Sequence, residues 1–143
     1  MKLALVAPLF ALVLLAADPA EKEFKALHGA WTVVAAERDG QPFDLIKGGT
    51  MTIKDQNFHI VTKAGTELKG DLRLDPAKKP KRMDLAHQAG PLRDKTWEAI
   101  YELDGDDFKL CYAEIEAGKE RPTEFKTAQD SGHLLVVLKR EKK

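Results

Sequence analysis

The stretch W-E-A-I-Y-E-L-D-G-D-D-F-K-L-C-Y, residues 97–112, decides the fold. Apolar and charged residues alternate on both sides of an Asp-Gly pair, a pattern typical of two antiparallel β-strands joined by a tight turn. We expect Asp104 and Gly105 to be the two turn residues. The cross-strand pairs are then Tyr101 with Phe108, Ala99 with Leu110, and Trp97 with Tyr112. The large aromatic side chains fall on one face, so this stretch predicts a β-hairpin with one buried face.

Two turns upstream follow the same rule. The expected pairs are Ile53 with Phe58 and Met51 with Ile60 around a turn at Asp55-Gln56, and Ile60 with Leu68 around a loop at 63–65. Gly65 supplies the left-handed residue of that loop. Similar segments predict eight strands, at 31–38, 50–54, 57–62, 66–74, 81–87, 96–103, 106–113 and 133–140. A shorter extended piece is expected near 123–127.

Consecutive hairpins with one apolar face predict a barrel, because a closed sheet has no exposed edges. The apolar spacing of 21–28 adds one or two turns of amphipathic helix, ended by Gly29. The predicted fold is therefore all-β, an up-and-down antiparallel barrel of about eight strands with a short N-terminal helix. The side chains expected to point inward are Trp31, Val33, Met51, Ile53, Phe58, Ile60, Leu68, Trp97, Tyr101, Phe108, Leu110, Tyr112, Leu134, Val136 and Leu138.

The composition is that of one ordinary globular domain. The chain has 143 residues, of which 43% are hydrophobic and 32% charged, and this length excludes a multidomain enzyme. Its 23 basic residues balance its 23 acidic residues, so we expect no nucleic-acid partner. The single cysteine, Cys111, excludes an intramolecular disulfide framework and a cysteine-rich zinc site.

The N-terminus has the pattern of a signal peptide. Lys2 precedes a stretch that is uncharged from residue 3 to residue 17 and ends in Ala16-Ala17. This stretch is shorter than the roughly 20 apolar residues of a membrane span. We expect cleavage after Ala17, which leaves 18–143 as a single domain without a stable membrane span, in the periplasm or outside the cell. An uncleaved N-terminal anchor is the alternative.

Residues that could carry chemistry have simpler explanations. Asp130-Ser131-Gly132-His133 are consecutive in a turn, so they cannot converge as a catalytic triad does. A calcium loop starting at Asp104 would place Lys109 where glycine is needed. The four histidines lack metal-ligand spacing, and we expect each to face solvent, although His87 or His133 could meet carboxylates in space. We therefore predict no catalytic residue, no metal site, no cofactor and no enzymatic activity.

One basic cluster surrounds Pro80. Lys78, Lys79, Lys81 and Arg82 could attract phosphate or an anionic polymer of the cell envelope. Aromatic residues that would stack on nucleic-acid bases are absent from this cluster. We interpret it as a solvated loop.

Several motifs together resemble one family. H-G-A-W-T-V-V (28–34) contains the Gly29-x-Trp31 element that opens the first barrel strand of lipocalins, and Lys139-Arg140 ends the last strand. Together with A-E-R-D-G-Q-P (36–42), Y-E-L-D-G-D-D-F-K-L-C-Y-A (101–113), R-P-T-E-F-K (121–126) and H-L-L-V-V-L-K-R (133–140), they resemble a bacterial lipocalin-like family of exported small domains, expanded in planctomycetes. The resemblance implies a barrel, export, and a closed end where Arg140 lies across the Trp31 ring.

These observations predict a binding module for a small apolar ligand at the open end of the barrel. An eight-stranded barrel is only just wide enough for its own side chains, so we expect at most a shallow pocket. We expect the lining to include some of Phe58, Leu72, Trp97 and Tyr112. The alternative is a protein-interaction or structural domain of the cell envelope with a filled barrel, and an enzyme is third. The sequence does not specify the oligomeric state.

Overall fold

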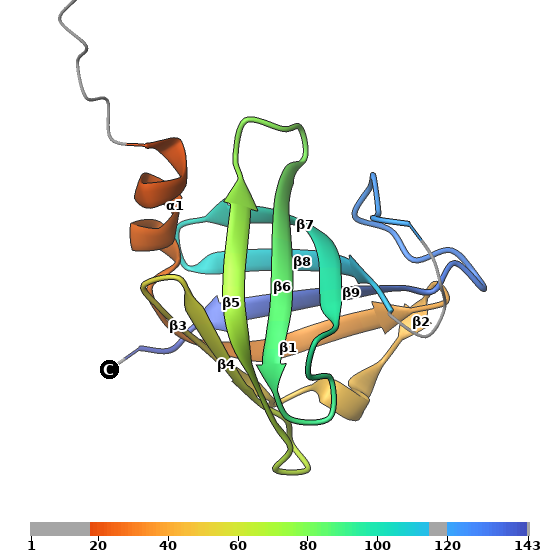
Figure 1. The fold of residues 1–143 in the computed structure, drawn as a ribbon. Helices are drawn as coiled ribbons and strands as arrows, with labels where there is room; N and C mark the ends of the chain where they lie inside the picture. Colours follow the sequence, from red (N-terminus) through yellow and green to blue (C-terminus); the bar gives the residue numbers. More distant parts are fainter. Residues whose placement is uncertain (1–17, 115–119, 143) are drawn as a thin grey trace, which may run out of the picture.

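The computed structural model describes residues 18–114 and 120–142, which form one closed barrel (Figure 1). The helical elements are α1 (Pro19–Leu27) and the short 3-10 helix η1 (Asp44–Ile46). The strands are β1 (Gly29–Arg38), β2 (Gln41–Pro42), β3 (Thr50–Lys54), β4 (Asn57–Val61), β5 (Glu67–Asp75), β6 (Lys81–Ala89), β7 (Thr96–Asp104), β8 (Asp107–Ala113) and β9 (His133–Arg140).

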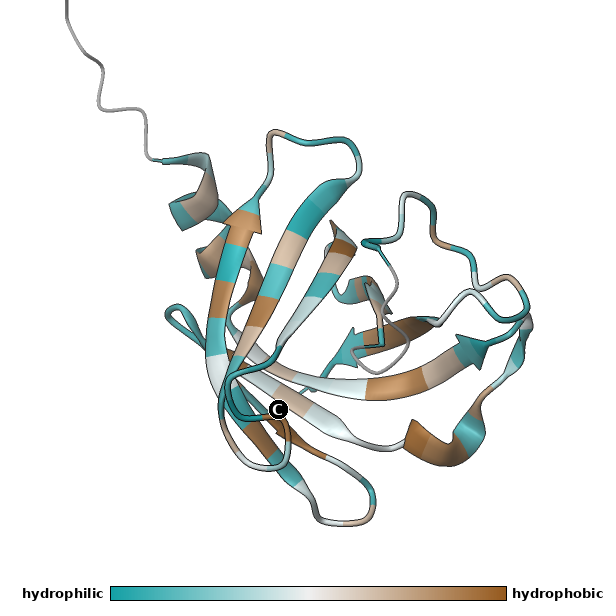
Figure 2. Ribbon diagram, turned by 45° about the vertical axis from the view of Figure 1, so that its right-hand side comes forward, coloured by the Kyte–Doolittle hydropathy of each residue, from teal (hydrophilic) through white to brown (hydrophobic). Residues whose placement is uncertain are grey.

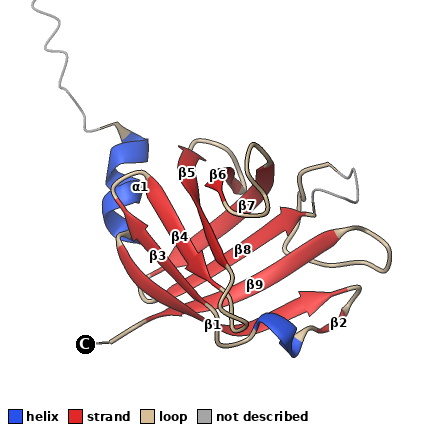
Figure 3. Ribbon diagram, turned by 60° about the horizontal axis from the view of Figure 1, so that its bottom comes forward, coloured by secondary structure: helices blue, strands red, loops and turns tan. Residues whose placement is uncertain are grey.

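The predicted all-β barrel is confirmed. β1 pairs with β3, each strand from β3 to β9 pairs antiparallel with the next, and β9 pairs back onto β1 (Figure 3). Eight strands therefore close the barrel in up-and-down order. β2 was not predicted; it is a two-residue strand that pairs with the end of β1, where Glu37 lies opposite Pro42.

The hairpin registers were predicted correctly at two of the three turns. Around Asp55-Gln56 and around the loop at 63–65, the observed pairs are Ile53 with Phe58, Met51 with Ile60, and Ile60 with Leu68. At the third turn, the prediction was wrong by two residues. The turn residues are Gly105 and Asp106, and the pairs are Leu103 with Phe108, Tyr101 with Leu110, and Ala99 with Tyr112.

The β7–β8 turn lies at Gly105-Asp106 because contacts from β9 hold it there. The Arg140 backbone N–H donates to the Asp106 carbonyl at 2.9 Å, and the Arg140 Nε donates to Asp106 Oδ1 at 3.0 Å. Gly105 takes the positive φ of 61° that this turn requires. A shift of two residues keeps each side chain on its face, so the inward face was predicted correctly.

Several element boundaries differ from the prediction by one or two residues; β1 begins at Gly29 instead of residue 31, and β6 ends at Ala89 instead of residue 87. The helix begins at Pro19 because the Asp18 side chain accepts a hydrogen bond from the Ala20 N–H and caps its first turn. Residues 123–127 form no strand. They belong to the 120–132 segment, in which the Arg121 guanidinium donates to the Ala99 carbonyl at 2.7 Å.

The core contains the side chains that were expected to point inward, together with others that were not predicted. Of the side chains expected inside, Val33, Ile60 and Trp97 are half-buried and the rest are buried. Alternation of apolar and polar residues along the strands is visible in Figure 2. Among the buried side chains that were absent from the predicted set are Leu27 of α1, Leu72 of β5, Met83 and Leu85 of β6, and Ile100 of β7.

One end of the barrel is closed by α1 and the last residues of β9. The Trp31 Nε1 donates to the Leu27 carbonyl at 2.9 Å, and the Arg140 guanidinium lies over the Trp31 ring, as the resemblance implied. The same guanidinium donates to the carbonyls of His28 and Ala26 at 2.7 and 2.8 Å. These contacts tie α1, β1 and β9 together.

Candidate ligand-binding recess

A recess opens into the barrel at the end opposite to Arg140. It has a volume of about 100 Å³. Two lining residues show which end this is, since Thr50 begins β3 and Thr62 follows β4. The other ends of β3 and β4 lie at the closed end, where Gly29 pairs with Ile53. The residues that line the recess are mostly apolar: Val33, Ile46, Gly49, Thr50, Met51, Ile60, Thr62, Leu68, Trp97, Leu110, Tyr112, Val136 and Leu138.

Two stacked aromatic rings form part of the wall. The rings of Trp97 and Tyr112 lie 4.4 Å apart at an interplanar angle of 16°. Trp97 is half-buried and Tyr112 is buried. Burial, followed by the charge of Glu114, raises the pKa of the Tyr112 hydroxyl well above its usual value, so the hydroxyl is neutral. The pair therefore offers an uncharged aromatic surface.

The side chain of His87 lies inside the barrel next to this wall. Its ring contacts Trp97 edge to face at 4.5 Å and Phe58 edge to face at 5.2 Å. Only 2% of His87 is exposed, and neither ring nitrogen has a hydrogen-bond partner among the described residues. Burial lowers the pKa of His87, which favours the neutral ring.

The expectation that every histidine faces solvent is wrong for His87. On β6, Met83, Leu85 and His87 follow one another at every second position and share the inward face. This alternation was present in the sequence, but the residue type argued for exposure. His28 is exposed, while His59 and His133 are half-buried.

Trp97 and Tyr112 line the recess as predicted, whereas Phe58 and Leu72 do not. Both are buried in the core. Phe58 is the second residue of β4, close to the β3–β4 turn, and Leu72 lies beside it, since its N–H donates to the carbonyl of Gln56. Their position along the strands places them deeper than the recess.

The recess also has walls that strand periodicity does not predict. Ile46 belongs to η1, and Gly49 lies in the link from η1 to β3. Beside Ile46, Leu45 is 76% exposed, and within the described ranges no other large apolar side chain is as accessible. An exposed leucine next to an apolar recess increases the apolar surface near its mouth.

The other candidate groups are held in structural contacts. The Asp130 N–H donates to Asp39 Oδ1, and the His133 N–H donates to Ser131 Oγ, as in an ordinary turn. Lys139 lies 3.4 Å from Asp107. Within 18–114 and 120–142, no group of three or more His, Cys, Asp or Glu side chains is placed to hold a metal ion.

The Cys111 thiol is also an unreactive group. The side chain is fully buried, and its Sγ lies 3.9 Å from the carbonyl of Lys126 in the 120–132 segment. Burial raises the pKa of the thiol to about 11, so little thiolate is present at neutral pH. Cys111 is therefore a packing residue.

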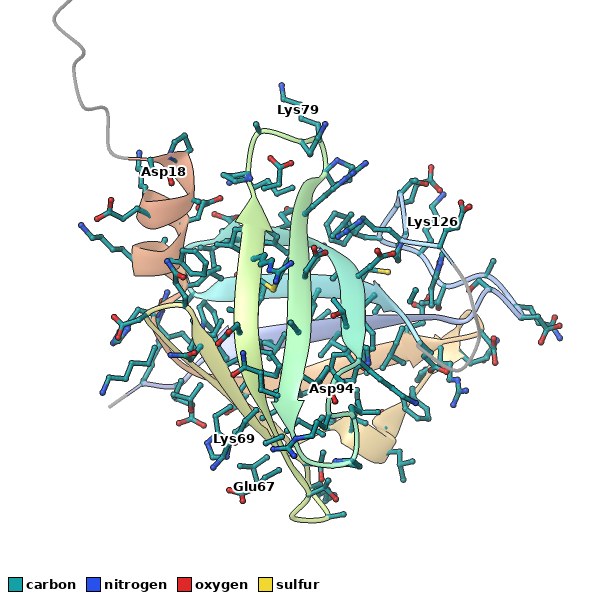
Figure 4. All side chains as sticks on the ribbon, viewed as in Figure 1. Asp18, Glu67, Lys69, Lys79, Asp94 and Lys126 are labelled. Atoms are coloured by element: carbon teal, nitrogen blue, oxygen red, sulfur yellow. The ribbon has the colours of Figure 1, made fainter. Side chains whose placement is uncertain are left out.

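A larger cleft lies outside the barrel, between α1 and the β3–β4 turn. Its volume is about 640 Å³. Most of its lining side chains are exposed, among them Asp18 (labelled beside α1 in Figure 4), Glu21, Lys25 and Asp55. A wide and solvated surface of this kind gives a ligand few contacts, so the recess inside the barrel is the better candidate despite its smaller volume.

Comparisons with family models, curated proteins and solved structures gave no significant match. Among the described residues, no helix has the length and apolar character needed to cross a membrane. The recess, its aromatic wall and the buried His87 are therefore the features of the molecule that point to a function.

Proposed function

We propose that the chain is an exported lipocalin-like domain that binds a small apolar molecule, or the apolar end of a larger one, in the recess. The observation that carries this proposal is the apolar lining of the recess at the open end of the barrel. Most ligand pockets measure roughly 300–1,000 Å³, and an apolar cavity of about 150 Å³ binds benzene. A recess of about 100 Å³ is smaller than either, so it can hold a short branched chain or part of one aromatic ring, while the rest of the molecule extends into solvent.

The size of the recess also limits the affinity. Few ligand atoms can be buried in it, and the contribution to binding of each buried atom is bounded. We expect micromolar binding or weaker, about −8 kcal/mol or less favourable. Thr50 and Thr62 near the mouth offer hydroxyl groups to a polar part of the ligand.

Export is the second part of the proposal. The apolar segment 1–17 supports it, although this segment lies outside the described residues. Asp18 caps α1 with its own side chain, so cleavage after Ala17 leaves every described element intact.

Fluorescence titration tests the binding. Trp97 lines the recess, whereas Trp31 is fully buried at the closed end. We expect saturable changes in Trp emission with small aromatic and branched aliphatic compounds, and loss of this response in Trp97→Phe. A panel of acyl chains, sterols and aromatic compounds covers the alternatives in ligand shape.

A recess-filling variant provides the matched control. Ile60→Phe adds volume to a lining residue, whereas Val61→Phe adds the same ring to its half-buried neighbour, which does not line the recess. Binding should weaken in Ile60→Phe and persist in Val61→Phe. If no compound binds, the small recess favours the second candidate, an interaction or structural domain whose barrel is filled by its own side chains.

A further inference from the structure

We propose that His87 is the polar recognition residue of this site and that the ligand is a neutral apolar molecule carrying one hydroxyl group, such as a substituted phenol. This inference rests on the proposed function, since it assigns a ligand class to the same recess. It assigns a binding role to the one inward-pointing imidazole of the described barrel.

His87 is buried without a hydrogen-bond partner for its ring nitrogens. Polar groups removed from water are nearly always hydrogen-bonded, because an unpaired one costs free energy. Both ring nitrogens of His87 lack a hydrogen-bond partner in the described part of the chain. The imidazole is in edge-to-face contact with the aromatic rings of Phe58 and Trp97. Such a group inside an otherwise apolar barrel is explained if it contacts a ligand.

His87 lies opposite Gly70 on β5, and Phe58 lies opposite Gly70 from the other side. Gly70 has no room for a side chain, because a Cβ atom there would lie 1.9 Å from the Ala86 carbonyl oxygen. The rings of Phe58 and His87 therefore meet across a bare stretch of backbone, and the free side of the imidazole is covered by Trp97.

His87 itself does not line the recess, and Trp97 connects the two. Trp97 contacts His87 and also lines the recess, and unlike His87 it is half-buried. A rotation of the Trp97 side chain would extend the recess to the imidazole. The ligand hydroxyl then reaches His87, while the apolar part stays among the lining residues.

The ligand class follows from the chemistry of a neutral imidazole. The ring has one nitrogen that donates and one that accepts, and a hydroxyl group can satisfy either. A carboxylate or an ammonium group would bring a charge into an apolar interior where no described charged side chain is hydrogen-bonded to the imidazole. A phenol or alcohol is therefore favoured over a fatty-acid carboxylate.

The test compares p-cresol with toluene, which has the same shape without the hydroxyl. Calorimetric titrations are carried out on the wild-type protein, on His87→Leu and on Phe58→Leu. Phe58→Leu is the matched control because it removes the other ring of the contact and keeps the imidazole. The same samples are followed by ¹⁵N NMR of the histidine side chains, in which His87→Leu identifies the His87 signals.

We expect wild-type protein and Phe58→Leu to bind p-cresol about fivefold more tightly than toluene, the ratio that corresponds to one net hydrogen bond. In His87→Leu the preference for p-cresol should disappear or reverse, because its hydroxyl would be buried without a partner, and in wild-type protein p-cresol should shift the His87 ¹⁵N signals. If His87→Leu does not fold, His87→Gln, which keeps a donor and an acceptor, should retain a preference for p-cresol and the NMR shift decides the case.

Two results would overturn the inference, and they are distinguishable. Equal affinities in the wild-type protein, or His87 signals unchanged by bound p-cresol, would exclude the role of His87 and leave the proposed function standing. If neither compound binds but another compound of the panel does, the inference fails and the proposed function stands; if no compound of the panel binds, both fail.

Discussion

The guanidinium carbon of Arg140 lies 4.3 Å from the centroid of the Trp31 ring. The two residues come from the last and first barrel strands, which pair at this point. Asp106 accepts a hydrogen bond from the same guanidinium, so the contact also holds the β7–β8 turn. One side chain thus links the closing seam of the barrel to the helix and to a distant hairpin.

We expect Arg140→Ala to lower the free energy of unfolding by about 2 kcal/mol, through loss of the cation–π contact and of its hydrogen bonds. Lys139→Ala is the matched control. Its side chain is 63% exposed and, among the described residues, forms an ion pair only with Asp107, so the loss should stay within about 0.5 kcal/mol. Arg140→Lys keeps the charge but not the planar fork, and should fall between them. The midpoints of denaturant unfolding check this order of stabilities, provided that the dependence of the free energy of unfolding on denaturant concentration is the same in all variants. Equal small effects for both alanine variants would contradict it.

A second prediction concerns Phe108 and its contribution to the stability of the core. Phe108 is fully buried, with its ring 5.3 Å from Trp31 and 6.4 Å from Tyr101, both edge to face. Phe108→Ala should cost about 3–5 kcal/mol, because it leaves a cavity between these rings. Phe125→Ala, at a half-buried position in the 120–132 segment, should cost clearly less. Equal losses in urea unfolding would show that the two rings contribute alike.

The faces of the strands could be predicted from the sequence, but contacts between distant residues could not. Apolar alternation identifies which side chains of β7 and β8 point inward. A turn at 104–105 and a turn at 105–106 keep the same face, so the pattern cannot choose between them. In the observed turn, Asp106 accepts a hydrogen bond from the side chain of Arg140, which is far away along the chain.

The candidate site was predicted only in part for similar reasons. Trp97 and Tyr112 lie on strands and followed from periodicity, whereas Ile46 belongs to the three-residue η1 and Gly49 to the link after it, both too short to show a periodic pattern. His87 continues the inward alternation of β6. Histidine is of intermediate burial among residue types, so composition alone could not place it in the core.

The buried His87 predicts a pH-dependent stability. Burial lowers its pKa in the folded protein below the ordinary value of 6.5. As the pH falls below about 6.5, the unfolded chain takes up a proton that the folded chain does not, so the free energy of unfolding decreases until the pH reaches the folded-state pKa. Above about pH 7 this group contributes no pH dependence.

Urea unfolding at about pH 7.5 and about pH 5.5 measures this effect. The wild-type protein and Phe58→Leu should both lose stability between these values. In His87→Leu the loss should be smaller, because the group that titrates is gone. A loss of the same size in His87→Leu would assign the pH dependence to other groups.

Processing of the N-terminus is a separate prediction. We expect the exported protein to begin at Asp18, since the small residues Ala16 and Ala17 end the apolar segment. N-terminal sequencing of protein recovered outside the cytoplasm checks this. Ala17→Asp should impair cleavage, whereas Ala20→Asp, beyond the expected cleavage point, should not. Recovery of the uncut chain in the membrane fraction would favour an anchor.

The last prediction concerns the 120–132 segment, which covers Cys111 on the outer face of β8. The Arg121 guanidinium anchors this segment by donating to the carbonyls of Met83 and Ala99 and to Asp84 Oδ1 at 2.6 Å. In the folded wild-type protein we expect the thiol to react slowly with Ellman's reagent, because it is fully buried and its pKa is raised to about 11.

Arg121→Ala removes all of these hydrogen bonds and should raise the labelling rate of Cys111 at least about tenfold. A free energy of local opening that is lower by about 1.4 kcal/mol increases the population of the open state tenfold. Lys126→Ala is the matched control, because its side chain is 79% exposed and only its backbone carbonyl lies near the thiol. Unfolding measurements on both variants separate local opening from global unfolding. If Arg121→Ala accelerates labelling only in proportion to its loss of global stability, the segment is not an independently opening cover and Cys111 is protected by the barrel as a whole.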